Sequence, residues 1–341
     1  MSVEQLPQTI RHILITGGAG FIGSHITDFL LSIQDIEAPI KFKVRILDNL
    51  STGNRAQNVE PMLEKFGGDR LEFMYGDITD LETCRRAVKD VDVVCHQAAL
   101  GSVPRSVENP LASHKNNVDG FINLLWAAKE AQIGAFVYAS SSSVYGDNPT
   151  LPKREGSEGS VLSPYAATKA IDEIYASVFA RCYGIRCVGL RYFNIFGPRQ
   201  DPKGAYAAVI PKFIDLLKNN KSPTINGDGS YSRDFTYVKN AAYANYLAIC
   251  RCLSSDDMGG AEVYNIGAGG QTTILQLFEL IQTAMQSDTP VNFAGIRPGD
   301  IPHSNADIYR AQSLLNYTPQ VTFEDGIYET VRWFLQKDTK I

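Results

Sequence analysis

Short apolar runs alternate with longer amphipathic stretches through the first half of the chain. The apolar runs are nearly continuous, as in parallel strands that helices cover on both faces, and they lie at 12–16, 43–47, 71–75, 91–95, 135–139 and 187–193. The stretches between them have helical spacing and lie at about 21–32, 54–66, 80–88, 108–132 and 163–183. Because strand and helix alternate repeatedly, the pattern predicts an α/β fold with a doubly wound parallel sheet.

The pattern changes after residue 194. Glycine- and proline-rich connections there join short helical and strand-like segments, which is typical of a smaller, loop-rich α/β cap on a sheet domain. A helical pattern at 239–252 and the strand-like VYNIG indicate that the chain returns to the sheet domain before the cap resumes. We therefore predict a discontinuous boundary, with a sheet domain of residues 1–194 plus about 235–267 and a cap of about 195–234 plus 268–341.

The composition of the chain argues against several classes of protein. The 341 residues carry a formal net charge of −5, which gives no basic surface for nucleic acid. The apolar runs are shorter than the roughly 20 residues that span a bilayer, and MSVEQLPQTIRH contains no apolar signal core. The six cysteines form no CxxC pair and the five histidines no HxxxH pair, so we expect a reducing compartment and no metal site. A cytoplasmic protein without nucleic-acid or membrane partners is expected.

A glycine-rich turn follows the first predicted strand. HILIT runs into GGAGFIG, in which Gly17 permits a tight turn, Gly20 lets backbone amides approach a pyrophosphate, and Gly23 allows the next helix to pack closely on the strand. The N-terminus of that helix presents free N–H groups and a positive dipole end to phosphate. This strand–turn–helix context predicts a dinucleotide-binding Rossmann domain.

Two carboxylates follow neighbouring predicted strands. Asp48 ends the second strand, where a carboxylate can accept hydrogen bonds from both hydroxyls of an adenosine ribose and repel a 2′-phosphate, which selects NAD over NADP. The alternative role for Asp48 is to cap the following helix. Asp77 follows the third strand, and it either caps the next helix or contacts the adenine edge.

A Tyr-xxx-Lys motif lies on the helix after the fifth predicted strand. Tyr165 and Lys169 are four residues apart, so both side chains lie on one helix face. A free phenol titrates near pH 10 and is a poor base at neutral pH, whereas a neighbouring ammonium and a positive nicotinamide ring favour phenolate. Hydroxyls at 140–143 end the fifth strand, and one of them can carry a proton between a sugar oxygen and the phenolate.

Together, these motifs resemble the extended short-chain dehydrogenase/reductase superfamily, and within it the nucleotide-sugar 4-epimerases. The resemblance covers essentially the whole chain and rests on GGAGFIG, LDN, HQAA, SSSSVYG, YxxxK, LRYFNIFGP, SRDFTYV and RPGD, in this order. GSVPRS and GAYAAVIP further resemble the bacterial UDP-N-acetylglucosamine 4-epimerases of surface-polysaccharide pathways. The resemblance implies an NAD-binding Rossmann domain with NAD as cofactor, and a UDP-sugar-binding cap.

The resemblance also implies roles for single residues. Tyr165 is the expected general base and acid at the sugar 4-hydroxyl, Lys169 its charged partner, and Ser141 the hydroxyl that bridges to the substrate. The expected cofactor-binding residues are Gly17, Gly20, Phe21, Ile22, Gly23, Asp48, Asn49, Asp77, Ile78, Gln97, Tyr165 and Lys169. The expected substrate-binding residues are Gly101, Ser102, Arg105, Ser141, Ser142, Asn194, Ala208, Arg233, Arg297, Asp300 and Ser304.

The substrate-binding residues divide by the part of the substrate that they are expected to meet. Arg233 and Arg297 would grip the diphosphate, with Asn194 beside it, and Asp300 would bind the uridine ribose. Arg105 either orders the pocket loop or meets a substrate carboxylate. The residues expected to line the sugar pocket are Gly101, Ser102, Asn194, Ala208 and Ser304.

Two differences from enzymes that share the pattern narrow the expected reaction. Nucleotide-sugar 4,6-dehydratases carry an Asp-Glu pair directly after the catalytic hydroxyl, where this chain has Ser142 and Ser143, so we expect no dehydration. Epimerases restricted to unacetylated sugars have a Tyr at the position of Ser304, and a serine leaves volume for a 2-acetamido group.

We therefore expect reversible 4-epimerisation of UDP-N-acetylglucosamine and UDP-N-acetylgalactosamine through a 4-keto intermediate, with NAD regenerated in every cycle. Unacetylated or uronic acid sugars remain alternative substrates. A net NAD-linked dehydrogenase or reductase and an inactive nucleotide-binding scaffold are alternatives of other classes. The helical stretches 108–132 and 163–183 are apolar on more than one face, which predicts a homodimer with a four-helix interface.

Overall fold

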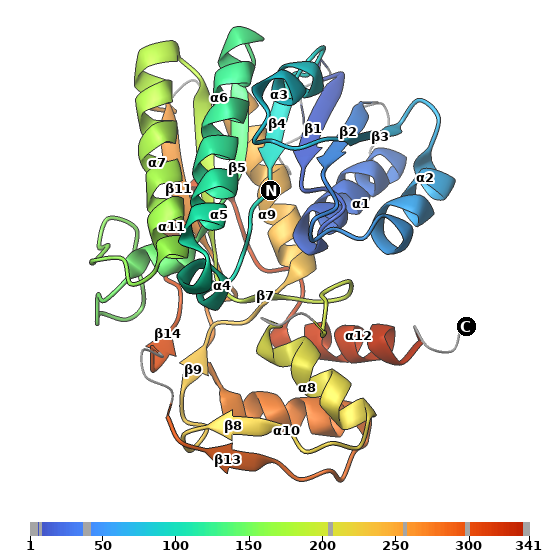
Figure 1. Cartoon of the computed structure of the whole chain (residues 1–341), viewed down its shortest axis with the longest axis vertical. Coiled ribbons are helices and arrows are strands. Elements are labelled where there is room, and N and C mark those ends of the chain that lie inside the picture. Colours follow the sequence, from blue (N-terminus) through green and yellow to red (C-terminus); the bar gives the residue numbers. More distant parts are fainter. Residues whose placement is uncertain are drawn as a thin grey trace.

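A seven-stranded sheet forms the centre of the computed structural model, which describes residues 6, 9–36, 42–203, 207–254, 258–296 and 301–336 (Figure 1). All neighbouring strands in the sheet run parallel. From edge to edge they are β11 (Ala261–Ile266), β6 (Arg186–Tyr192), β5 (Ala135–Ser141), β4 (Val93–His96), β1 (His12–Thr16), β2 (Lys43–Asp48) and β3 (Leu71–Tyr75). This topology confirms the predicted doubly wound α/β fold.

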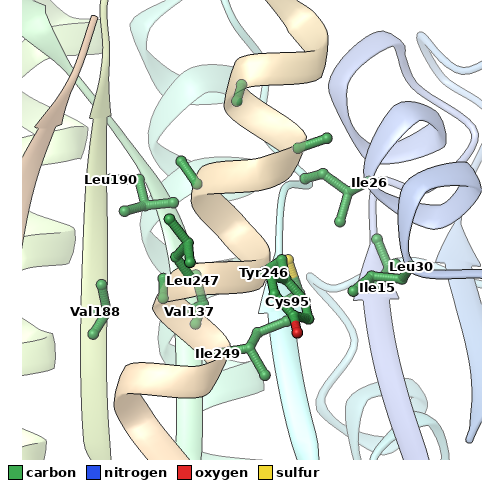
Figure 2. Packing of buried hydrophobic residues seen from close by; sticks show 14 of the residues in the cluster. Ile15, Ile26, Leu30, Cys95, Val137, Val188, Leu190, Tyr246, Leu247 and Ile249 are labelled. Carbon is green, nitrogen blue, oxygen red and sulfur yellow. The ribbon is translucent and has the colours of Figure 1, made fainter. Parts of the chain in front are cut away.

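Helices cover both faces of the sheet. One face packs on α1 (Phe21–Ile36), α2 (Glu60–Phe66), α9 (Val238–Ser254) and α11 (Tyr309–Leu315). The other packs on α3 (Leu81–Ala87), α6 (Gly120–Glu130) and α7 (Pro164–Tyr183). Leu247 on α9 belongs to one buried cluster with Val137 and Val188 of the sheet (Figure 2). Burial on both faces explains why the strands are almost continuously apolar in the sequence.

A smaller layer lies beyond the carboxyl ends of the strands (Figure 1). Its elements are α8 (Val209–Lys218), α10 (Ile274–Met285), α12 (Phe323–Gln336), β8 (Thr224–Asn226) and β13 (Asn292–Ala294). Side chains of its helices and of its two-stranded sheet form a separate apolar cluster. Between these segments the chain returns to the sheet domain through α9 and β11. The residue limits of the two domains stay predictions.

Short strands join the two layers. β9 (Ser232–Arg233) lies between β12 (Thr272–Thr273) and β14 (His303–Ser304), and β7 (Ile195–Phe196) pairs with β10 (Thr236–Tyr237). Segments that lie far apart in the sequence therefore meet beside the ends of the large sheet. Within the described ranges, no helix has the length and apolarity needed to cross a membrane.

A helical path covers most of the predicted helix over 108–132, from Pro110 to Glu130, but it is not α-helical throughout and a separate helix precedes it. The separate helix is α4 (Val103–Glu108), and the path consists of α5 (Pro110–His114), a π-helical turn (Lys115–Asp119) and α6. The break lies at Asn109, whose backbone is not helical (φ −139°, ψ 79°) and whose side chain accepts a hydrogen bond from the Ala112 N–H at 3.0 Å. Pro110 disfavours helical geometry in the residue before it and opens a new helix.

Candidate functional site

A cavity of about 460 Å³ opens where the central strands end. Its wall includes one residue at or just after the carboxyl end of each of six strands, namely Gly17, Asp48, Gly76, Gln97, Ser141 and Tyr192. In a doubly wound sheet, ligands bind in the crevice at this edge, because the loops that leave the strands converge there. The cavity is therefore the candidate active site.

The glycine-rich turn has the geometry of a dinucleotide cradle. Gly17 has a φ of +70°, and a Cβ there would lie 2.7 Å from the Ala98 backbone nitrogen. A Cβ on Gly23 would lie 2.3 Å from the Gly17 carbonyl oxygen, so α1 approaches β1 too closely for a side chain. Gly20, Phe21, Ile22 and Gly23 line the cavity at the start of α1, where the first N–H groups have no partner within the helix. The turn thus fits a pyrophosphate.

Asp48 lies in the cavity wall and is nearly buried. Its carboxylate accepts hydrogen bonds from the Ala19 N–H at 3.0 Å and the Leu50 N–H at 2.7 Å, while burial raises the pKa of the carboxyl. The helical segment that follows is capped by Asn54, whose side chain accepts from the Gln57 N–H at 2.9 Å. The capping alternative for Asp48 is therefore wrong, and its placement fits a role at the cofactor.

Asp77 lies outside the cavity wall but contacts Asn49, which lines the cavity. Its carboxylate accepts hydrogen bonds from the Asn49 side-chain amide and the Thr79 N–H, both at 2.8 Å. Asp80 caps α3, so the capping alternative for Asp77 is wrong as well. Asn49 and Ile78 line the cavity, whereas Asp77 does not, and its contact with adenine stays a prediction.

The three expected catalytic residues line the same cavity. Ser141 ends β5, and its Oγ accepts hydrogen bonds from the Ser143 N–H at 3.2 Å and the Ser143 hydroxyl at 2.9 Å. Tyr165 lies in the first turn of α7, where its N–H donates to Ser106 Oγ at 3.0 Å. Lys169 follows one turn later and is 2% exposed. The fold thus brings a hydroxyl, a phenol and an ammonium to one wall.

Lys169 is tightly held. Its Nζ donates to the Ala139 carbonyl oxygen at 2.9 Å and to Asp172 Oδ2 at 3.1 Å. Asp172 is fully buried, and burial raises the pKa of its carboxyl to about 7. Lys169 was identified from the sequence, whereas Asp172, three positions after it on the same helix, was not.

A polar triangle supports the inner wall of the cavity. The Tyr192 hydroxyl donates to Gln97 Oε1 at 3.0 Å and accepts from Asn245 Nδ2 at 2.7 Å. Gln97 Nε2 in turn donates to Asn245 Oδ1 at 3.1 Å. Gln97 was expected at the cofactor, whereas Tyr192 and Asn245 were not identified from the sequence. The signal in the sequence is weak, because both lie in patterns that predict only a strand and a helix.

Other polar wall residues were also missed, namely Ser51, Thr52, Asn116 and Gln200. The neighbouring Asn117 is buried and ties down the loop that follows β4. Its side chain accepts from the Leu100 N–H at 2.8 Å and donates to the Leu100 carbonyl oxygen at 3.2 Å. The signal in the sequence is weak, because Asn116 and Asn117 lie in a largely polar stretch, from His114 to Asp119.

The expected substrate residues divide into three groups. Gly101, Ser102, Ser141 and Asn194 line the cavity, and Ser102 and Asn194 have positive φ angles of 94° and 38°. Arg297 and Asp300 lie outside the described residues. The others lie outside the cavity wall, and these are Arg105, Ser142, Ala208, Arg233 and Ser304.

Arg233 and Ser304 nevertheless lie side by side, because β9 and β14 pair in register at these residues. The Arg233 guanidinium donates to the Ser232 carbonyl oxygen at 2.8 Å and to the Pro302 carbonyl oxygen at 3.1 Å. Ala208 is exposed and precedes α8. Expected contacts of these residues with substrate stay predictions.

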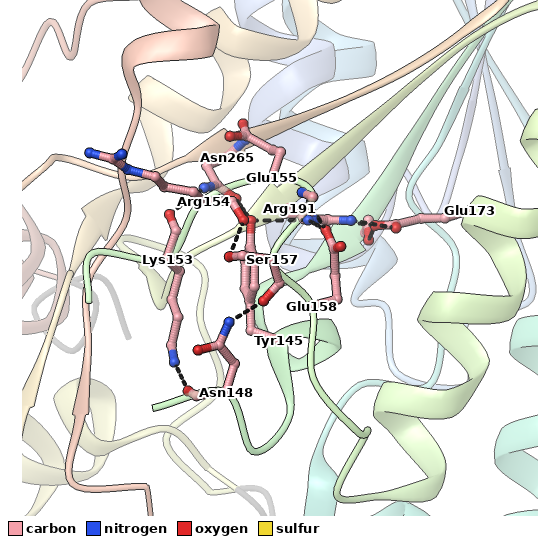
Figure 3. Close-up of polar contacts among 12 residues, drawn as sticks. Tyr145, Asn148, Lys153, Arg154, Glu155, Ser157, Glu158, Glu173, Arg191 and Asn265 are labelled. Carbon is pink, nitrogen blue, oxygen red and sulfur yellow. Dashed lines mark hydrogen bonds and ion pairs between the residues drawn. The ribbon is translucent and has the colours of Figure 1, made fainter. Parts of the chain in front are cut away.

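A buried arginine of β6, Arg191, links this strand to α7 and to the segment that contains Glu158 (Figure 3). Arg191 pairs with Glu173 at 2.7 Å and with Glu158, and it donates to the Tyr145 hydroxyl at 3.0 Å. Glu173 also accepts from Ser140 Oγ at 2.6 Å, next to Ser141 in the chain. This network joins α7 to the strand end that carries the predicted catalytic serine.

Comparisons with known proteins agree over most of the chain. The family model described as "NAD dependent epimerase/dehydratase family" matches residues 13–267. A protein of Methanocaldococcus jannaschii described as a putative UDP-glucose 4-epimerase is 40% identical over 323 residues, which cover 94% of this chain and 97% of that protein.

Solved structures give the same picture. A UDP-N-acetylglucosamine 4-epimerase from Methanobrevibacter ruminantium, in complex with UDP-N-acetylmuramic acid, is 42% identical with a TM-score of 0.86, over 96% of this chain and 99% of that chain. A UDP-glucuronic acid 4-epimerase from Bacillus cereus, in complex with UDP-glucuronic acid and NAD, is 30% identical with a TM-score of 0.84, over 96% and 99% of the two chains. The similarity therefore spans both layers and the cavity between them.

Proposed function

Because the chain belongs to the NAD dependent epimerase/dehydratase family, we propose that it inverts carbon 4 of a UDP-N-acetylhexosamine. The chain is an NAD-dependent UDP-sugar 4-epimerase and hence an isomerase, and the proposal concerns which sugar it converts. The observation that carries the proposal is the cavity at the strand ends. It collects the glycine turn, Asp48, Ser141, Tyr165 and Lys169 in one wall.

The proposed mechanism assigns each polar side chain one task. Tyr165, as phenolate, takes the proton of the sugar 4-hydroxyl, directly or through Ser141. Lys169 supplies the positive charge that favours phenolate, and Asp48 orients the adenosine ribose. Bound NAD supplies the hydride acceptor and donor at carbon 4. The 4-keto sugar then turns about its diphosphate link and presents its other face, after which Tyr165 returns the proton.

Ser304 supports the choice of an N-acetylated sugar. It is partly buried and lies beside Arg233, where a small side chain leaves room next to the proposed diphosphate anchor. The similar enzyme from Methanobrevibacter ruminantium is a UDP-N-acetylglucosamine 4-epimerase. The similar enzyme from Bacillus cereus is a UDP-glucuronic acid 4-epimerase, which keeps a uronic acid as the second candidate, with Arg105 as its proposed carboxylate partner.

The substrate is tested with a panel of nucleotide sugars. The purified protein is incubated separately with UDP-N-acetylglucosamine, UDP-glucose and the uronic acid form of the first sugar, and 4-epimer formation is followed by NMR. We expect the highest kcat/KM with UDP-N-acetylglucosamine. Stoichiometric release of NADH would instead favour a net dehydrogenase, and absence of turnover with all three sugars would favour an inactive scaffold.

Ser304→Tyr tests the pocket itself. We expect this variant to lose at least about tenfold in kcat/KM for the acetylated sugar relative to UDP-glucose, because the larger ring fills the space for the acetamido group. The ratio between the two sugars serves as an internal control for general loss of activity. An unchanged ratio would remove Ser304 from substrate selection.

A homodimer is also proposed. Apolar side chains that a monomer leaves exposed gather on α4, α5 and α7, and they are Val107, Leu111, Ile174, Tyr175 and Val178. The helices α4 and α5 pack against α7, so these side chains can form one continuous face. Pairing of two such faces would bury the apolar surface, and the helical path 110–130 and α7 of each chain would form the four-helix interface. A cytoplasmic location stays a prediction.

A further inference from the structure

The ammonium of Lys169 has little freedom. Lys169 is 2% exposed and Asp172 is 0% exposed, and the ammonium donates to Asp172 Oδ2 at 3.1 Å and to the Ala139 carbonyl oxygen at 2.9 Å. An ammonium has three N–H donors. Two of them are thus held by the protein, and one is left for the cavity that Lys169 lines.

The Asp172 carboxylate is paired through one of its two oxygens, Oδ2. Its Oδ1 atom is buried and has no hydrogen-bond partner among the described residues. A buried carboxylate is costly unless it is paired, and removal of one partner leaves the other uncompensated. Asp172 is therefore retained at an energetic cost, and Lys169 is the partner that compensates its charge.

The other titratable groups around this pair are neutral or already paired. Glu173, the next residue on α7, is held by Arg191 of β6. Burial raises the pKa of Tyr138 on β5 well above its ordinary value and lowers the pKa of His96 on β4 to about 3, so both are uncharged near neutral pH. In the described part of the chain, α5 and α6 add no charged group that shifts the pKa of Asp172.

We propose that Asp172 is a positioning residue that holds the Lys169 ammonium and sets how much of its positive charge reaches Tyr165. The inference rests on the proposed function, in which Lys169 favours the phenolate of Tyr165. An ionised Asp172 offsets the ammonium, so the pair is nearly neutral as seen from the phenol. A neutral Asp172 leaves the full positive charge of the Lys169 ammonium acting on the phenol. Burial, which raises the pKa of the Asp172 carboxyl to about 7, brings both forms within reach near neutral pH.

The substitution Asp172→Asn separates position from charge. An amide oxygen still accepts from Lys169, but the negative charge is gone. The phenol of Tyr165 should then titrate at lower pH, by at least about 0.5 pH units, because one opposing charge has been removed. Glu279→Gln is the matched control, because it removes the same charge from an exposed position on α10.

Two measurements follow the phenol in the full-length protein. The first is the acid limb of the kcat profile with the UDP-sugar, and the second is the ultraviolet difference titration of each variant against the same variant with Tyr165→Phe. The second needs no substrate. A protein that shows the titration shift but no epimerase turnover would reject the proposed function alone.

We expect both midpoints to fall in Asp172→Asn and to stay unchanged in Glu279→Gln and in Asp172→Glu, which keeps the charge. Asp172→Ser, a smaller uncharged variant, should shift the titration in the same direction as Asp172→Asn. Midpoints that match those of the wild type in folded, uncharged variants would overturn the inference. Failure of both uncharged variants to fold would also count against it, because a positioning role predicts a folded protein with altered titration.

Discussion

Tyr165 owes its position to contacts made by its backbone. Its N–H donates to Ser106 Oγ at 3.0 Å, and Ser163 caps the same helix end by accepting from the Ala166 N–H at 3.1 Å. The hydroxyl of Ser106 also donates to the Val103 carbonyl oxygen at 2.7 Å. The loop that carries the proposed sugar contacts and the proposed base are therefore connected through one buried serine.

Replacement of the phenol tests its proposed role as base. Tyr165→Phe keeps the ring and removes the hydroxyl, so we expect turnover to fall by at least about 100-fold with little change in stability. Tyr309→Phe, at a side chain that is 73% exposed, is the control. Turnover of Tyr165→Phe within about tenfold of the wild type would remove this residue from proton transfer.

His96 gives a prediction on pH and stability. It is buried at the carboxyl end of β4, its Nδ1 lies 2.7 Å from Thr16 Oγ1, and burial lowers its pKa to about 3. Between that value and the ordinary value near 6.5, the unfolded chain binds the proton and the folded protein does not. Stability from this group is therefore complete above about pH 6.5 and is lost as the pH falls.

Urea unfolding of wild type and His96→Asn at two pH values measures this effect. We expect the difference in unfolding free energy between them to shrink by about 2 kcal/mol from pH 7 to pH 5, because only the wild type titrates. The contributions of Asp172 and Asp234, whose raised pKa values act in the opposite sense, are common to both proteins. A constant difference between wild type and His96→Asn would contradict the prediction.

At the scale of elements, α7 serves two surfaces. Its buried side carries Lys169 and Phe179, and its other side leaves Ile174 62% exposed and Val178 37% exposed. Such an apolar side is consistent with a covered interface. One helix therefore places the proposed base and also borders the proposed partner subunit.

A charge on this face should break the proposed dimer. For Ile174→Asp we expect a monomer at micromolar concentration, whereas the wild type has twice the chain mass, because a carboxylate cannot be buried unpaired between helices. Light scattering after gel filtration measures the mass. Phe293→Asp, on β13 in the cap, is the control at another exposed apolar side chain. A monomeric wild type would refute the dimer directly.

The strand–helix alternation was readable from the sequence because parallel strands and amphipathic helices have distinct periods. The glycine turn was readable because its residues are consecutive. The π-helical turn at 115–119 was not, since apolar spacing does not distinguish it from α-helix. Contacts such as that of Tyr192 on β6 with Asn245 on α9 depend on which elements become neighbours, and no local pattern specifies this.

At the scale of the whole molecule, Asp234 joins three distant segments. Its carboxylate accepts from the N–H groups of Ala268 at 2.8 Å, Gly269 at 3.0 Å and Ala306 at 3.3 Å. The residue is fully buried, and burial raises the pKa of its carboxyl to about 6. It also follows Arg233 directly, so it holds the proposed diphosphate anchor in register with the sheet domain.

Removal of the Asp234 carboxylate should lower stability and weaken binding of the UDP-sugar. Asp234→Ala leaves three backbone donors without their acceptor, and we expect a loss of about 3 kcal/mol in unfolding free energy. We also expect KM for the UDP-sugar to rise more than kcat falls, because Arg233 loses its support but Tyr165 does not. Asp228→Ala, at an exposed turn nearby, is the control. An unchanged KM would show that Arg233 does not depend on Asp234.

The chain returns to the large sheet between two cap segments. This order limits how the protein can evolve by exchange of segments. A fragment that stops before Ala261 lacks the outermost strand as well as α10 and α12, and a fragment that starts at residue 195 contains β11 without the β6 edge on which it hydrogen bonds. Neither layer can be inherited as one uninterrupted gene segment. Exchange of a cap between homologues requires two simultaneous crossovers, so substitutions in the loops are the simpler route to a new sugar preference.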